Sequence, residues 1–383
     1  MTHCLLWIIY LSFISLGLPD SLLGSAWPVM YPVLGAPVSA AGVISMLISV
    51  FIAVSSLCSD RMTRQFGAGK VNMVSCALTA AALYGFSCST SFWQLCVLAI
   101  PYGLGAGGVD AALNNYVAIH YDSRHMSWLH CMWGIGSSVG PYIMSCALMG
   151  SGWESGYRQV AVMQMFLTAI LILSLPLWKR GESKEMMPTK SLTLRETLAI
   201  PGAKSAAAYF FCYCGLEQTV VLWGSSYLVL RGGLPEEAAA GFAALFVTGL
   251  TFGRGACGFA AAKFGDAQMM RIGLTVTAAG ILCLLLPMGE AATLVGLVIS
   301  GVGCAPLYPS AIHATPSRFG VARSQALIGV QMAGASIGCV VLPPLFGVAS
   351  QYLSLGLFPW YLAGLLTAMA IVNRRISCKC DHS

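Results

Sequence analysis

Apolar residues fill most of this chain in runs of roughly 18–24 residues, and short polar turns separate the runs. A helix of that length spans the roughly 30 Å hydrocarbon core of a bilayer, because each helical residue rises about 1.5 Å. The pattern predicts twelve transmembrane helices. We place them at 5–28, 40–58, 71–90, 94–118, 128–149, 157–177, 205–229, 236–260, 271–288, 291–313, 325–348 and 356–373.

The predicted spans form two sets of six. We expect an N-terminal bundle over 1–178, a cytoplasmic linker over 179–204, a C-terminal bundle over 205–373 and a cytoplasmic tail over 374–383. The two sets repeat each other at an offset of 198 residues, since Gly103-x-Gly105 matches Gly301-x-Gly303, Phe66-Gly67 matches Phe264-Gly265, and Gly136…Gly140 matches Gly334…Gly338. Because each repeat has six spans, both repeats keep the same orientation. The predicted fold is an all-α polytopic membrane protein made of two parallel six-helix repeats.

Composition supports this assignment. Charged residues make up 9% of the chain, against about 25% in soluble domains. Eighteen of the twenty Lys and Arg residues fall in connections on one side of the membrane, and Arg158 and Arg231 fall on the other side. The eighteen include Arg254, which we assign to the turn after the eighth span. The positive-inside rule therefore places both termini in the cytoplasm. We expect a multi-pass protein of the plasma membrane (the cell inner membrane), and the net charge of +6 does not indicate nucleic-acid binding.

The cysteines indicate packing and not chemistry. Fifteen are scattered singly through apolar runs, which is typical of small packing residues and not of a disulfide framework. The tail Cys378-Lys-Cys380-Asp-His382 supplies too few ligands for a closed metal site. The spans contain no nucleophile–base or metal constellation. We therefore expect no enzyme activity, no metal and no cofactor, and we expect a monomer.

Three acids fall well inside the predicted spans, away from the span ends, namely Asp20, Asp110 and Glu217. A charged side chain at a helix centre costs roughly 2.5–3.5 kcal/mol, so each acid either pairs with a neighbouring helix or faces a wet cavity. Because we expect no Lys or Arg within the membrane to neutralise these acids, protons or sodium ions are the expected neutralisers, and desolvation favours the protonated form. Asp110 lies one helical turn before Asn114 and is the leading candidate for proton coupling.

Polar and aromatic residues near these acids are candidates for solute binding. Amide side chains supply hydrogen bonds to a sugar, and aromatic rings stack on its face, although each ring can equally be a packing residue. In the tenth span, Pro306 and Pro309 predict a broken helix that exposes backbone groups. The candidate substrate-binding residues are Asn114, Asn115, Trp27, Trp223, Gln218, Tyr308 and Gln331.

Several motifs resemble the fucose-permease-like branch of the major facilitator superfamily. They are Gly17-Leu-Pro-Asp20…Trp27-Pro28, Asp110-Ala-Ala-Leu-Asn114, Leu129-His-x-x-Trp-Gly134-Ile-Gly136…Gly140-Pro141, Tyr213-Cys-Gly215-x-Glu217…Trp223…Tyr227 and Gly253-Arg254. The resemblance implies a proton- or sodium-coupled sugar carrier, with the acids of spans 1 and 4 on Asp20 and Asp110 and the partner amide on Asn114. Two features depart from the branch: fucose permeases carry Glu where this chain has Asp110, and the loop signature after span 2 survives only as Asp60-Arg61…Gly67-x-Gly-Lys70.

The predicted function is import of a small polar solute, most simply a sugar, by proton symport through alternating access. Two alternatives stay open from the sequence. An efflux antiporter of the same superfamily would have the same fold and buried acids, and a non-transporting membrane receptor or scaffold would bind a ligand without accumulating it.

Overall fold

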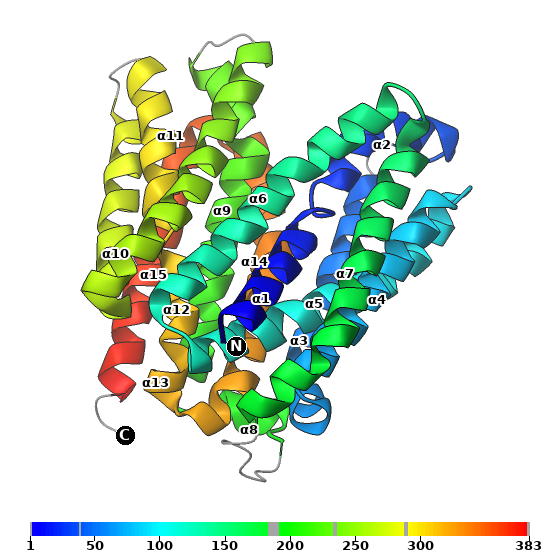
Figure 1. Cartoon of the computed structure of the whole chain (residues 1–383). Coiled ribbons are helices and arrows are strands. Elements are labelled where there is room, and N and C mark those ends of the chain that lie inside the picture. Colours follow the sequence, from blue (N-terminus) through cyan, green and yellow to red (C-terminus); the bar gives the residue numbers. More distant parts are fainter. Residues whose placement is uncertain (1, 38–39, 183–190, 233–235, 287–289, 381–383) are drawn as a thin grey trace. The chain divides into compact units, whose positions relative to one another are not determined.

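The computed structural model describes residues 2–37, 40–182, 191–232, 236–286 and 290–380, and the regular structure in these ranges is helical. In chain order the helices are α1 (Thr2–Gly17), α2 (Leu22–Val33), α3 (Ala40–Phe66), α4 (Ala68–Ser87), α5 (Phe92–His120), α6 (Ser123–Leu148), α7 (Gly152–Glu182), α8 (Leu194–Ala199), α9 (Ala203–Gly232), α10 (Glu236–Leu285), α11 (Glu290–Cys304), α12 (Leu307–His313), α13 (Thr315–Phe319), α14 (Val321–Tyr352), the 3₁₀ turn η1 (Leu355–Leu357) and α15 (Phe358–Cys380). Figure 1 shows them as a set of long helices joined by short turns.

The helices match the predicted spans. Eight helical stretches of the described chain are long and apolar enough to cross a membrane. The helices α4, α6 and α9 are long enough, at 20, 26 and 30 residues, but less apolar. In addition, α10 contains two crossings on either side of Gly265, where the backbone leaves the helical region. The described chain therefore holds the twelve predicted crossings, and part of the predicted linker, 183–190, lies outside the described residues.

Two crossings are broken in the middle. The first consists of α1 and α2, which are separated by the turn at residues 18–21. This turn was not predicted, although Pro19 has no N–H to donate to a continuous helix. The tenth consists of α11 and α12, with Pro306 as the residue before α12, which confirms the break predicted there. Backbone groups freed by such breaks are tolerated inside a membrane where protein or a cavity surrounds them.

The internal repeat is visible in the backbone. Gly67, between α3 and α4, has φ 84° and ψ 153°, and Gly265, the kink inside α10, has φ 69° and ψ 168°. Side-chain-bearing residues avoid this region, so glycine is required at both turns. The two glycines are 198 residues apart, as the sequence repeat predicts.

Helix contacts repeat at the same offset. A Cβ atom on Gly103 would strike the backbone of Ile48, and one on Gly301 would strike the backbone of Phe246, so the fourth crossing touches the second as the tenth touches the eighth. Each partner is again 198 residues from its counterpart. The same holds for Gly105 against Thr79 and Gly303 against Thr277. Close backbone contact through small residues is the usual way in which helices pack in lipid.

Packing divides the chain into two compact units. Unit 1 contains residues 1–116 and 132–193, and unit 2 contains residues 117–131 and 194–383. The end of α5, the following turn and the start of α6 thus pack with the C-terminal helices. Trp128 Nε1 donates to the Gly255 carbonyl of α10 at 3.3 Å, and a Cβ on Gly258 would strike the same indole ring.

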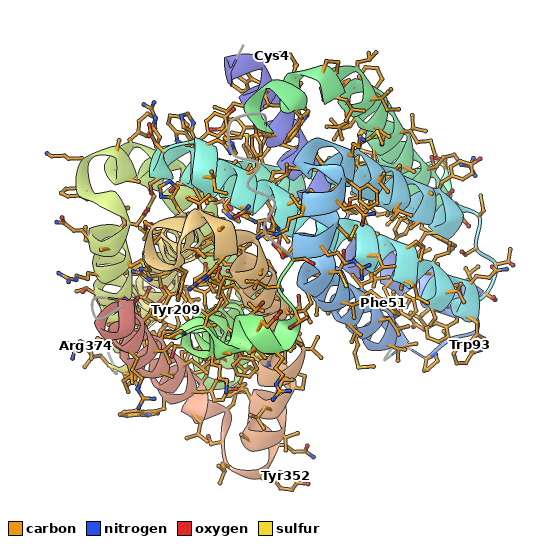
Figure 2. The ribbon with its side chains drawn as sticks, turned by 90° about the horizontal axis from the view of Figure 1, so that it is seen from below. Cys4, Phe51, Trp93, Tyr209, Tyr352 and Arg374 are labelled. Carbon is orange, nitrogen blue, oxygen red and sulfur yellow. The ribbon has the colours of Figure 1, made fainter. Side chains whose placement is uncertain are left out.

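The outward-facing surfaces are apolar. Trp93, at the start of α5, is 73% exposed, and Tyr352, at the end of α14, is 79% exposed. Figure 2 shows both side chains projecting from the ends of their helices. Phe166, Leu173 and Phe252 are also exposed. Apolar residues exposed in this number fit a surface that faces lipid.

Candidate functional site

The clearest polar site in unit 1 surrounds the break between α1 and α2. Asp20 lies in the turn just before α2, and its side chain is not covered by other residues of the chain. Its Oδ2 accepts a hydrogen bond from Trp133 Nε1 of α6 at 2.8 Å, and its Oδ1 accepts one from the Tyr102 hydroxyl of α5 at 3.3 Å. A carboxylate at the start of a helix is also favoured by the helix dipole. The chain thus places an acid in the break of the first crossing, hydrogen-bonded to two neighbouring helices.

Glycines hold this turn against α6. A Cβ atom on Gly17 would strike the backbone of Trp133, and Cβ atoms on Gly136 and Gly140 would strike the backbones of Ile14 and Leu18. Hydrogen bonding adds to this contact, because Ser21 Oγ donates to the Ser137 carbonyl at 2.7 Å. The repeated glycines in the sequence were the signal for this helix pair.

The second acid of unit 1 is half-buried on α5. The Asn114 amide nitrogen donates to the Asp110 carboxylate at 2.7 Å and to the Asp110 carbonyl at 2.9 Å. The predicted one-turn pairing of Asp110 and Asn114 is therefore confirmed. Asn114 has no exposed surface, so in this conformation its amide orients Asp110.

The two carboxylates of unit 1 share one neighbourhood. Asp20 lies near enough to Asp110 for the two charges to interact. Within the described ranges no Lys or Arg lies within ion-pair distance of either acid. Both carboxylates accept hydrogen bonds from neutral N–H or O–H donors, which stabilise a carboxylate without neutralising it.

Unit 2 holds the third predicted acid, and here the sequence interpretation needs correction. We assigned Arg254 to a cytoplasmic turn and expected no basic residue inside the spans. The structure places Arg254 within α10, buried, with Nη2 at 3.6 Å from the Glu217 carboxylate and 3.4 Å from the Tyr213 hydroxyl. The predicted eighth span, 236–260, already contained this residue. Glu217 therefore has a fixed cation beside it, and its predicted role in proton coupling stays a prediction.

Three predicted solute-binding residues contact other parts of the protein in this structure. Trp27 is 5% exposed and belongs to the apolar core of unit 1. Trp223 Nε1 donates to the Pro343 carbonyl at 2.9 Å. Gln331 is buried and exchanges hydrogen bonds with Thr315 at 3.0 and 3.2 Å.

The other predicted residues lie in different surroundings. Asn115 is buried and Gln218 is exposed. Tyr308 is nearly buried, and its ring packs against Tyr213 and against His130, with centroid distances of 5.6 and 4.7 Å. Tyr308 thus lies beside the group formed by Glu217, Arg254 and Tyr213. The role in solute binding stays a prediction for every candidate residue named in the sequence analysis.

The sequence interpretation also missed several polar residues. Trp133 and Tyr102 are 113 and 82 residues from Asp20, a separation that no local pattern reveals. His130, near the start of α6, is buried, and its ring packs against Tyr308. In unit 2, His313 Nδ1 lies 2.6 Å from Asp266 Oδ2, and Nε2 lies 2.9 Å from the Tyr121 carbonyl.

Comparisons with known proteins agree with this architecture. A family model described as Major Facilitator Superfamily matches residues 9–258. The chain is 23% identical to the Saccharomyces cerevisiae protein "Bypass of stop codon protein 6", in an alignment that covers 93% of this chain and 79% of the yeast protein.

Solved structures show the same fold. The proton:xylose symporter XylE is 11% identical, with a TM-score of 0.80, over 96% of this chain and 94% of that one. The E. coli fucose:proton symporter FucP is 14% identical, with a TM-score of 0.71, over 96% of this chain and 97% of that one. At these identities the likeness concerns the fold alone.

Proposed function

Because the chain belongs to the Major Facilitator Superfamily, whose model covers residues 9–258, it is a multi-pass membrane transporter, and we propose that it imports a sugar-like solute by proton symport. The observation that carries the proposal is Asp20. Its exposed carboxylate lies inside the helix bundle of unit 1, accepts hydrogen bonds from two neutral donors, and has no cation within ion-pair distance among the described residues. Such a group can release and rebind a proton from water.

The geometry supports protons over sodium ions. A hard cation is bound by several oxygen ligands, whereas the indole N–H of Trp133 can only donate. At Asp110 the amide nitrogen of Asn114, also a donor, approaches the carboxylate. Both acids therefore sit in surroundings that suit a carboxyl group exchanging a proton.

A polyhydroxylated solute fits the same surroundings. Asp20 offers acceptors for hydroxyl groups, and the half-buried Trp133 offers an aromatic face beside it. Two structural neighbours are described as proton symporters of xylose and of fucose, which supports this choice of solute class. We place the protein in the plasma membrane with both termini in the cytoplasm, on the distribution of Lys and Arg.

Transport by purified protein tests the proposal. Reconstituted proteoliposomes are given an inward pH gradient, an inward sodium gradient or no gradient, and uptake of labelled xylose, fucose and glucose is followed. We expect accumulation of at least one sugar above its external concentration with the pH gradient alone. Accumulation with sodium alone would refute proton coupling. Binding of a sugar without any accumulation would favour a receptor, and extrusion of an organic dye in exchange for protons would favour an efflux antiporter.

A further inference from the structure

Trp133 differs from the other tryptophans near the acids. Trp27 is buried in the core and Trp223 donates to a backbone carbonyl, whereas the indole of Trp133 is half-buried and donates to the exposed carboxylate of Asp20. At 2.8 Å this is the shorter of the two hydrogen bonds that Asp20 accepts, since Tyr102 donates at 3.3 Å.

The backbone around this hydrogen bond is fixed on both sides. The turn before α2 is held against α6 by the contacts of Gly17, Gly136 and Gly140 and by the hydrogen bond from Ser21 to the Ser137 carbonyl. Trp133 lies one helical turn before Gly136 on α6, and its own backbone is in contact with Gly17, so its indole reaches Asp20 from a helix that is held against the turn. A donor placed in this way needs little reorganisation to meet the carboxylate.

An indole N–H discriminates between the two states of a carboxyl group. It can only donate, and a hydrogen bond to an ionised acceptor is roughly twice as strong as one to a neutral acceptor. The bond from Trp133 therefore stabilises the ionised form of Asp20 more than the protonated form. Removing the N–H would make Asp20 hold its proton to a higher pH.

We propose that Trp133 is a positioning residue for Asp20. Its indole N–H holds the ionised carboxylate at the α1–α2 break and sets the pH at which Asp20 releases its proton. The proposal deepens the proposed proton symport and rests on it for its role in transport. Among the described residues, the ionisable groups that interact with Asp20 are Tyr102 and Asp110 on α5, and Tyr157 of α7 in turn interacts with Tyr102. None of them changes when Trp133 is replaced.

The test measures protonation directly, so that it does not depend on knowing the solute. Purified protein in lipid is titrated by infrared difference spectroscopy, and the carboxyl band of Asp20 is identified by its loss in Asp20→Asn. Trp133→Phe keeps a ring and removes the N–H, and Trp133→Leu, which also lacks a donor, serves as a second variant if the first fails to fold. The matched control is Trp153→Phe, because Trp153 is buried on α7 and packs edge-on against Tyr157.

We expect the midpoint of the Asp20 band to move upward by about half to one pH unit in Trp133→Phe, by less in Tyr102→Phe, and not at all in the control. The pH dependence of sugar uptake should move in the same direction and by the same amount. An unchanged midpoint in both Trp133 variants, or an equal shift in Trp153→Phe, would overturn the inference. Wild-type protein that takes up no sugar under a pH gradient would instead count against the proposed function.

Discussion

The substitution Asp110→Asn distinguishes a role of this residue in proton coupling from a role in solute binding. Asparagine keeps the shape of Asp110 and an oxygen that can still accept from Asn114, whose amide nitrogen lies 2.7 Å from the carboxylate in the wild type. The substitution removes the charge and the ability to exchange a proton. Since only the charge-assisted part of one hydrogen bond is lost, we expect folding to lose about 1 kcal/mol or less.

The effect on transport should be much larger. A pH gradient of one unit provides about 1.4 kcal/mol per proton, which supports about tenfold accumulation in a one-proton symporter. If Asp110 carries that proton, Asp110→Asn should bring the accumulation ratio to about one while labelled solute still exchanges with unlabelled solute across the membrane, because exchange never requires deprotonation.

The assay compares both processes in the same proteoliposomes. Uptake is measured under an inward pH gradient, and exchange is measured after preloading with unlabelled sugar and no gradient. Asp20→Asn is the companion variant, and it should impair exchange as well if Asp20 touches the solute. Accumulation by Asp110→Asn as high as in the wild type would show that Asp110 is structural and that the proton is carried elsewhere.

Three further predictions concern packing and charge. Gly136→Val should cost about 3 kcal/mol or more and lower the melting temperature sharply, because a Cβ meets the α1 backbone, whereas Gly24→Ala, with open space around it, should be neutral or slightly stabilising. Equal melting temperatures of the two variants would contradict the close backbone contact between α1 and α6. Glu217→Gln should cost about 3–5 kcal/mol, because it leaves the Arg254 charge buried, and Glu217→Leu combined with Arg254→Met should recover most of that loss in thermal melting. Trp27→Ala should lower stability by about 3–5 kcal/mol, and unaltered melting together with weaker sugar binding in calorimetry would instead place Trp27 at the solute.

Most of the fold could be predicted because the patterns that indicate it can be read along the sequence, without knowing which helices are in contact. Apolar runs of membrane-spanning length and the 198-residue repeat together predict the helices, and the paired turns at Gly67 and Gly265 follow from the repeat. The break after α1 was missed because the apolar run continues through Pro19 and Asp20, and hydropathy does not register a lost backbone donor.

The candidate site was predictable only in part, because its contacts join distant residues. Asp110 and Asn114 lie one turn apart, so helical geometry alone pairs them. The donors to Asp20 come from α5 and α6, and only the packing of glycines against α1 brings them there. Arg254 was misplaced because counting charges by connection treats every basic residue near a span end as belonging to the loop.

The two repeats share a helical framework but differ in the ionisable residues that they carry. Residues 198 positions apart make equivalent backbone contacts between helices: Gly103 contacts Ile48, and Gly301 contacts Phe246. The position 198 residues after Asp110 is Tyr308, whose ring is packed among other aromatic rings. The position 198 residues after Asp20 is the uncharged Gln218. Both repeats thus supply the scaffold, but of the three acids well inside the spans, the two with no Lys or Arg within ion-pair distance in the described chain, Asp20 and Asp110, belong to the first repeat.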